Sequence, residues 1–181
     1  RILAQHQQVL RIDWESCEYL DDDCNGRVLD KVRKHIDDFD VVIIEDYGKG
    51  VINPVLVRDI VALCKQNKKI VTVDPKDDHF EYYEGVTALT PNLKEAQTMG
   101  NFKVRNERDI DLLGDTIVQR LNPEALLLTL GEKGMKLFRK DGKSFHLPTY
   151  ALEVFDVSGA GDTVIAVFSL ALAAGASFEE A

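Results

Sequence analysis

The stretch VVIIED, residues 41–46, decides how this chain is expected to fold. It is a continuous run of β-branched residues ending in two carboxylates, which is typical of a strand buried on both faces of a parallel sheet. The turn YGKG follows, and Asn53 with Pro54 then offers an N-cap and a first helical residue. We expect this helix to run to about Asn67, so the unit is a strand followed by a helix.

The same alternation continues along the chain. Further strands are expected at 69–74, 86–90 and 125–130, and helices over 26–38, from Asn92, over 106–121 and from about 160 to 174. Residues 6–13 have loose strand character, and 134–140 with 143–150, joined by Asp141-Gly142, predict a hairpin. Strand–helix alternation predicts an α/β fold with a mostly parallel sheet and helices on both faces.

Composition restricts the function classes. The chain has 181 residues, 45% of them hydrophobic and 29% charged, which suits one soluble domain with a sizeable core. Its formal net charge of −9 argues against a nucleic-acid or acidic-membrane partner. No apolar run reaches the ~18 residues of a membrane-spanning helix. The three cysteines lack metal-ligand spacing, which predicts reduced thiols in a cytoplasmic protein.

The stretch DVSGAGD, residues 156–162, leads directly into an apolar helix. Small residues at a helix N-terminus let an anion approach the unpaired amides and the positive end of the helix dipole. Asp162 would lie beside a bound phosphate, where it makes sense as a base that takes a proton from an attacking hydroxyl. A tight turn in which Asp162 stabilises the helix dipole explains the same residues, so the motif alone leaves both interpretations open.

Three other motifs follow other expected strands. In TVDPK, Lys76 could reach a nucleotide phosphate. In TPNLKEAQ, Asn92 and Glu95 fit a capping box, and they equally fit a site that organises Mg²⁺ near phosphates. The glycines of LTLGEKGM permit tight backbone near a ligand. Each motif taken alone is also explained by an ordinary strand end, cap or turn.

Together, the order and spacing of these motifs resemble the ribokinase-like (PfkB) family of sugar and nucleoside kinases. DVSGAGD is similar to the family signature DTxGAGD, from which Val157 and Ser158 depart, and TLGEKG resembles its nucleotide loop. Asn92 followed by Glu95 resembles the family's asparagine and glutamate pair. The resemblance covers nearly the whole chain and implies a ribokinase-like three-layer sandwich. Residues 1–181 would then form a partial kinase domain, without the family's N-terminal and C-terminal parts.

One branch of that family is more similar than the others, on the segments LRIDWE, DYGKG, VDPK and FEYYEGVTALTPNLKEA. Its members phosphorylate D-glycero-β-D-manno-heptose 7-phosphate at O1 for ADP-heptose and lipopolysaccharide core synthesis. This chain departs from the branch in having EDYGKG where SDYxKG is common, and Trp14 where Phe is common. The resemblance implies ATP and Mg²⁺, allows a monovalent cation, and suggests a homodimer with an adenylyltransferase domain often fused to the kinase.

The resemblance also implies roles for individual residues. Asp162 would be the catalytic base, and the amides of Gly159, Ala160 and Gly161 would hold the phosphate in transfer. The residues implied on the ATP side are Lys76, Asn92, Leu93, Lys94, Glu95, Thr129, Gly131 and Gly134, with Glu95 holding the metal through water. Those implied for the sugar phosphate are Arg11, Asp46, Tyr47 and Lys49. Arg11 equally fits a solvated strand arginine, and Asp156 is expected to hold the loop rather than to act in catalysis.

Other functions remain open at this point. Another kinase of the same family, such as a ribokinase or fructokinase, would share every motif above. A non-catalytic nucleotide- or sugar-binding module would share the fold but not the phosphoryl transfer. A dinucleotide-binding oxidoreductase is disfavoured, since no G-x-G-x-x-G follows the early strands.

Overall fold

The computed structural model describes residues 2–4, 7–149 and 159–181. The strands are β1 Ile2–Ala4, β2 Gln7–Leu10, β3 Val41–Glu45, β4 Ile70–Asp74, β5 Ala88–Leu89, β6 Ala125–Thr129, β7 Met135–Arg139 and β8 Ser144–Leu147. The α-helices are α1 Asp22–Lys34, α2 Pro54–Gln66, α3 Leu93–Gly100, α4 Glu107–Leu121 and α5 Ala160–Ala173. Short 3₁₀ helices are η1 Ile36–Asp38, η2 Asp77–Tyr83 and η3 Gly131–Lys133.

The main sheet has the strand order β3-β4-β5-β6-β7-β8 within the part of the chain that the structure describes. Strands β3 to β6 run parallel to one another, while β7 and β8 continue the sheet in antiparallel fashion. The mostly parallel sheet predicted from the apolar runs is therefore confirmed.

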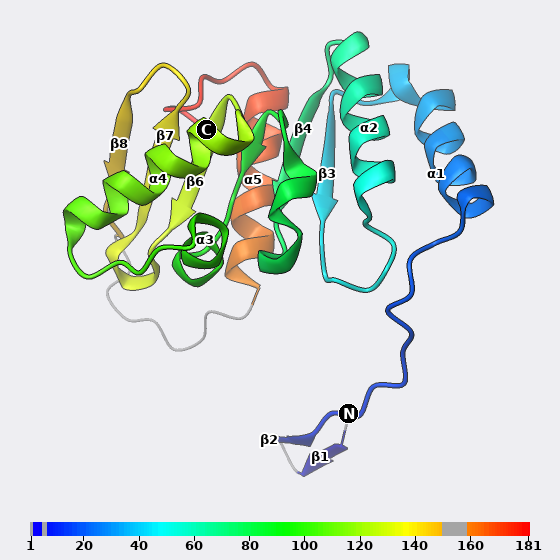
Figure 1. Ribbon diagram of the computed structural model, residues 1–181, viewed down its shortest axis with the longest axis horizontal. Coiled ribbons are helices and arrows are strands. Elements are labelled where there is room, and N and C mark those ends of the chain that lie inside the picture. Colours follow the sequence, from blue (N-terminus) through cyan, green and yellow to red (C-terminus); the bar gives the residue numbers. More distant parts are fainter. Residues whose placement is uncertain (1, 5–6, 150–158) are drawn as a thin grey trace.

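Helices cover both faces of this sheet. Successive side chains of a strand point to opposite faces, so an apolar strand contributes to a core on each face. On β6, Leu126 and Leu128 belong to the larger core, which also contains side chains of α2 to α4 and has partly buried side chains of α1 packed against it. Ala125 and Leu127 belong to the second core, together with Phe168 of α5. In Figure 1, α2, α3 and α4 lie in front of the sheet and α5 lies behind it, which confirms the three layers.

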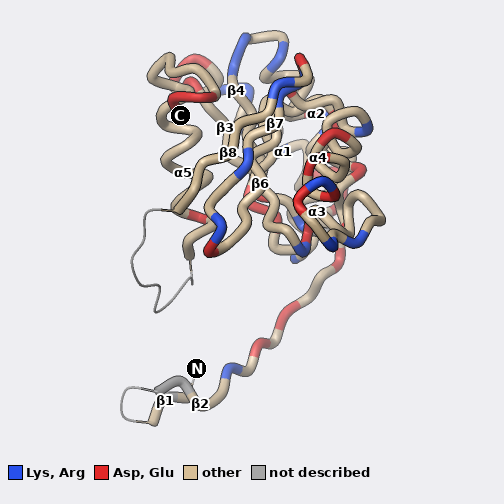
Figure 2. Tube along the Cα trace, turned by 90° about the vertical axis from the view of Figure 1, so that its left-hand side faces the viewer, with Lys and Arg blue, Asp and Glu red and all other residues tan. Residues whose placement is uncertain are grey.

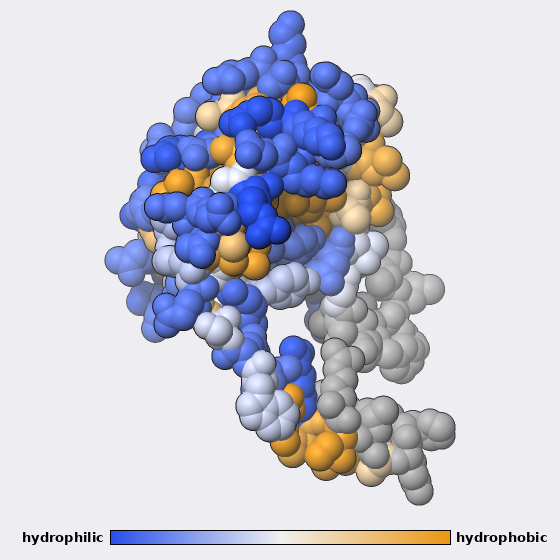
Figure 3. Space-filling view, turned by 90° about the vertical axis from the view of Figure 1, so that its right-hand side faces the viewer, coloured by the Kyte–Doolittle hydropathy of each residue, from blue (hydrophilic) through white to orange (hydrophobic). Residues whose placement is uncertain are grey.

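The N-terminal strands β1 and β2 form a separate antiparallel hairpin. Figures 1 and 2 show this hairpin projecting from the rest of the molecule on an extended segment that leads to α1. Figure 3 shows apolar side chains gathered at the hairpin, where Ile2, Val9 and Leu10 are exposed. The strand expected over 6–13 is therefore shorter than predicted.

Most element boundaries agree with the sequence, and the differences have local causes. Helix α2 has Asn53 as N-cap and Pro54 in its first turn, as predicted. The helix expected over 26–38 starts earlier, because the Asp21 side chain accepts a hydrogen bond from the Cys24 amide at 2.8 Å and caps it. It ends at Lys34 and is followed by η1. Strand β5 has only two residues instead of the five expected over 86–90.

The four parallel strands end at one edge of the sheet, and α5 begins at that edge. Parallel α/β sheets bind ligands at this edge. No helix in the described ranges combines the length and the apolarity needed to span a bilayer.

Candidate active site

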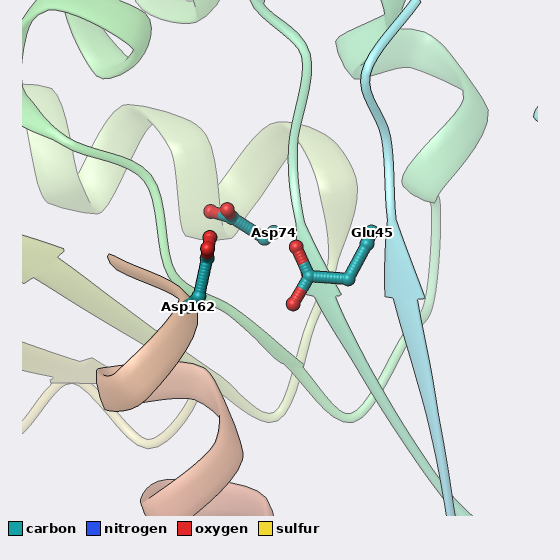
Figure 4. A group of neighbouring side chains, drawn as sticks. All are labelled: Glu45, Asp74 and Asp162. Atoms are coloured by element: carbon teal, nitrogen blue, oxygen red, sulfur yellow. The ribbon is translucent and has the colours of Figure 1, made fainter. Parts of the chain in front are cut away.

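Three carboxylates meet where β3 and β4 end and α5 begins. Glu45 and Asp74 are register partners on the adjacent parallel strands β3 and β4, so both side chains leave the same face of the sheet. Asp162 reaches them from the first turn of α5. One oxygen from each carboxylate lies within 4.8 Å of those of the other two. Figure 4 shows the three groups pointing toward one another from these three elements.

A buried hydrogen bond ties α5 to β4. The hydroxyl groups of Thr72 and Ser169 are 2.7 Å apart, and both residues are fully buried. Thr72 lies two residues before Asp74, so both face α5. Ser169 lies seven residues after Asp162, two helical turns along the same face. This bond therefore sets the position of Asp162 relative to Asp74.

The crowding of negative charge raises pKa values in the cluster. Burial is the largest cause that raises the pKa of Asp74 to about 7, and the charges of Glu45, Glu95 and Asp162 add to it. Burial also raises the pKa of Glu45, and Asp162 raises it further. The negative charge of Asp162 is the largest cause that raises the pKa of the exposed Tyr47. These shifts place Tyr47 and Glu95 within electrostatic reach of the carboxylates.

Except for Lys76, the residues predicted for the nucleotide side lie at the ends of β5 and β6. Asn92 caps α3 in a capping box with Glu95, so that interpretation of the motif is confirmed. A parallel β-bridge joins Asn92 to Thr129, the last residue of β6. Leu93 and Lys94 occupy the first turn of α3. The structure therefore brings this predicted set together on one side of Asp74.

The glycines after β6 shape a tight turn beside this set. Gly134 has φ +86°, and a Cβ there would lie 2.0 Å from the backbone oxygen of Leu147. Only glycine fits this position without rearrangement. Gly131 also has a positive φ, but the space around it is open.

On the other side of Asp74, the DYGKG loop follows β3. Asp46 is buried and its carboxylate accepts hydrogen bonds from within the protein, including one from the Gly48 amide at 2.8 Å. Tyr47 is exposed, and Lys49 forms an ion pair with Glu15. The side chain of Lys76 lies beside Gly48, so this lysine contacts the loop as well as following β4.

Two predicted residues are not part of this assembly. Arg11 follows β2 in the projecting N-terminal segment and forms an exposed ion pair with Asp13. Asp156 and the rest of the signature before Gly159 lie outside the described residues.

The sequence interpretation overlooked Glu45. It selected the neighbouring Asp46, whose side chain is buried away from the carboxylate cluster. The available signal was the strand period of two, because Glu45 is paired with Asp74 in the register and shares its face. The oxygen donors of Glu45, Asp74 and Asp162 suit a hard cation such as Mg²⁺.

Comparisons with known proteins identify the family of this chain. The model of the pfkB family carbohydrate kinases matches residues 4–181, so the chain belongs to that family of kinases. It is 41% identical over 180 residues to the bifunctional protein HldE of Geobacter sulfurreducens, covering 99% of this chain and 37% of that protein. The HldE of Pasteurella multocida is 42% identical over 181 residues, again with 37% of that protein covered. The chain thus spans little more than a third of these relatives.

Solved structures show the same fold. The Arabidopsis thaliana ribokinase complexed with ribose and ATP matches with a TM-score of 0.70 at 25% identity, covering 90% of this chain and 50% of that one. The Escherichia coli phosphofructokinase-2 in complex with potassium matches with a TM-score of 0.76 at 16% identity, covering 89% of this chain and 52% of that one. The ribokinase-like fold implied by the motifs is therefore confirmed.

Proposed function

We propose that this chain is part of a kinase domain that transfers the terminal phosphate of ATP to D-glycero-β-D-manno-heptose 7-phosphate at O1. The reaction would serve ADP-heptose and lipopolysaccharide core synthesis in the cytoplasm. The support is the family match, the HldE relatives and the DYGKG and VDPK segments. The proposal extends to a homodimer, and the bifunctional relatives favour a fused adenylyltransferase domain.

The position of Asp162 carries the proposal. Apart from Lys76, which follows β4, the residues proposed for the nucleotide follow β5 and β6, and the DYGKG loop follows β3. Asp162 lies between the two groups, against Asp74 at the end of β4. A base that serves phosphoryl transfer must lie between the acceptor hydroxyl and the nucleotide, and the position of Asp162 suits that role.

In the proposed reaction, Asp162 accepts the proton of the acceptor hydroxyl while the oxygen of that hydroxyl bonds to the terminal phosphorus of ATP. The bond between that phosphorus and the bridging oxygen breaks, and ADP leaves. The amides of Gly159, Ala160 and Gly161 would donate hydrogen bonds to the phosphoryl oxygens from the start of α5. Lys76, Asn92, Leu93, Lys94, Thr129, Gly131 and Gly134 would hold ATP, and Tyr47 and Lys49 would serve the sugar phosphate. Asp46, whose carboxylate is buried and hydrogen-bonded within the protein, would serve it by holding their loop. Arg11 would have to reach it from the projecting N-terminal segment.

Magnesium, when bound, would supply positive charge that offsets the charge of the phosphates. We propose that Glu95 holds it through water beside the carboxylate cluster that contains Asp74, since the negative charge of Glu95 acts on Asp74. A monovalent cation near Asp156 is also part of the proposal, and the potassium complex of a protein with the same fold favours it.

The decisive experiment replaces the base in the natural-length protein and follows ADP release with a panel of sugars and sugar phosphates. Asp162→Asn should lower kcat by about 10²–10⁴-fold, which is what a positioned base contributes. Asp115→Asn, an exposed carboxylate of α4, is the matched control and should leave kcat unchanged. Activity of Asp162→Asn within a few fold of wild type would show that Asp162 is not the base.

The same panel separates the alternatives. Equal turnover of free ribose or fructose would favour another sugar kinase of this family over a heptose phosphate kinase. ATP binding without transfer to any acceptor would favour a non-catalytic module.

A further inference from the structure

A buried hydrogen-bond network lies behind the DYGKG loop. Its centre is the carboxylate of Asp46, whose side chain is only 1% exposed. One oxygen, Oδ2, accepts a hydrogen bond from the Tyr83 hydroxyl at 2.6 Å and lies 2.8 Å from Nδ1 of His79. The other oxygen, Oδ1, accepts from the Gly48 amide. Because a buried carboxylate is costly unless it is fully hydrogen-bonded, this network holds the start of the loop in one conformation.

The Tyr83 hydroxyl joins this loop to a second one. It donates to Asp46 and accepts a hydrogen bond from the backbone amide of Lys76 at 3.0 Å. Burial and the bond to Asp46 raise the pKa of Tyr83 above its ordinary value, so the hydroxyl keeps the proton that it donates. Tyr83 is fully buried at the end of η2, so its position does not depend on solvent.

The two loops that Tyr83 joins also touch each other directly. Gly48 has φ +64°, and the position of a Cβ on it lies 3.5 Å from Cε of Lys76. The stem of Lys76 therefore runs along the loop. On the loop's other side, the Gly50 carbonyl accepts a hydrogen bond from the Leu20 amide at 3.1 Å. A shift of residues 46–50 would move the surface against which Lys76 lies.

We propose that Tyr83 is a positioning residue of the kinase site, whose single hydroxyl holds the loop of residues 46–50 and Lys76 in a fixed mutual arrangement. The loop carries residues proposed for the sugar phosphate, and Lys76 is proposed for the nucleotide. Tyr83 thus places acceptor-side and nucleotide-side groups together without touching either substrate. This role rests on the proposed function.

The test compares Tyr83→Phe with Tyr82→Phe in the natural-length protein. The two tyrosines are adjacent. Within the described part of the chain, however, the Tyr82 hydroxyl bonds only to the Tyr19 hydroxyl, at 2.8 Å. Losing one hydrogen bond to a charged group corresponds to a factor of about 10–100. We expect Tyr83→Phe to raise KM for the sugar phosphate and for ATP by about 10-fold or more at nearly unchanged kcat. Tyr82→Phe should leave both KM values near those of wild type.

Urea unfolding of each variant establishes that it is folded under the assay conditions. A purely structural role would lower the active fraction, and hence kcat, and would leave both KM values unchanged. Such a result, or equal KM values for the two variants, would overturn the positioning role while the proposed function stands. If Tyr83→Phe does not fold, Asp46→Asn decides through KM for ATP, because it keeps the shape of Asp46 but weakens its bond to Tyr83. Since Asp46 lies in the loop proposed for the sugar phosphate, an unchanged KM for ATP would overturn the positioning role. A wild-type protein that phosphorylates no sugar would refute the proposed function and this role with it.

Discussion

The hydroxyl pair of Thr72 and Ser169 gives the most direct test of how the fold positions Asp162. Both hydroxyls are fully buried and bond to each other at 2.7 Å. Removing one partner leaves the other buried without it, at a cost of about 1–3 kcal/mol, whereas removing both leaves nothing unsatisfied. Each single variant should therefore lower the free energy of unfolding by more than half of the loss in the double variant. The two single losses should add up to more than the loss in the double variant.

The surroundings decide where in that range each variant falls. In Thr72→Val, Ser169 can turn its hydroxyl to the carbonyl of residue 165 in its own helix, so the cost should be near 1 kcal/mol. In Ser169→Ala, Thr72 belongs to a central strand and has no such carbonyl, so the cost should approach 3 kcal/mol. The double variant Thr72→Val/Ser169→Ala should cost less than the sum of the two by more than about 1 kcal/mol.

Urea unfolding followed by circular dichroism measures these differences, because Trp14 is 87% exposed and reports poorly on the core. The kinase assay supplies a second readout, since Asp162 lies two turns from Ser169 on α5. Ser169→Ala should lower kcat. The double variant should recover part of that loss, because the apolar side chains that replace both hydroxyls can pack α5 against β4 again. Costs that add to within about 0.5 kcal/mol would show that the two hydroxyls are not coupled and would refute this account of how α5 is placed.

Further predictions concern the carboxylates and the turn after β6. Since the pKa of Asp74 is about 7 in the folded protein and near 3.9 in an unfolded chain, the folded state binds more protons between these values. The free energy of unfolding, measured in urea without Mg²⁺, should therefore fall as pH rises from about 4 to 7, and Asp74→Asn should flatten this slope. If wild type and Asp74→Asn gave parallel curves of unfolding free energy against pH, the raised pKa of Asp74 would be contradicted. Glu45→Ser should lower the pKa of Asp74, because it removes one of the negative charges that raise this pKa. NMR titration of the Asp74 carboxyl group measures it, and an unchanged pKa would show that Glu45 does not lie close to Asp74. Gly134→Ala should cost more than about 3 kcal/mol through strain and the clash with Leu147, while Gly131→Ala, with open space around it, should cost about 1–2; similar urea midpoints would contradict the tight turn.

Local sequence signals were enough to predict most of the fold. The apolar runs predicted the parallel strands, and the caps Asn53 and Asn92 were visible from residue type alone. The predicted start of α1 was wrong because Asp21 caps the helix. Asp21 is followed by two further aspartates, and the sequence does not tell which carboxylate is the cap. Strand β5 is short because only Ala88 and Leu89 pair with its neighbours, and pairing is a tertiary property.

The candidate site was predictable only where a residue's role follows from its own segment. Asp162 is such a residue, since a carboxylate in the first turn after glycines stands out in the sequence. Glu45 and Asp46 are not, because adjacent strand residues point to opposite faces and the sequence does not tell which face α5 covers. Because Thr72 and Ser169 place α5 against β4, the side chain of Glu45 faces the candidate site, while that of Asp46 faces Tyr83. Two neighbouring carboxylates thus have different surroundings because of one helix position. Glu45 adds charge beside Asp162, and Asp46 is buried where it shapes the loop.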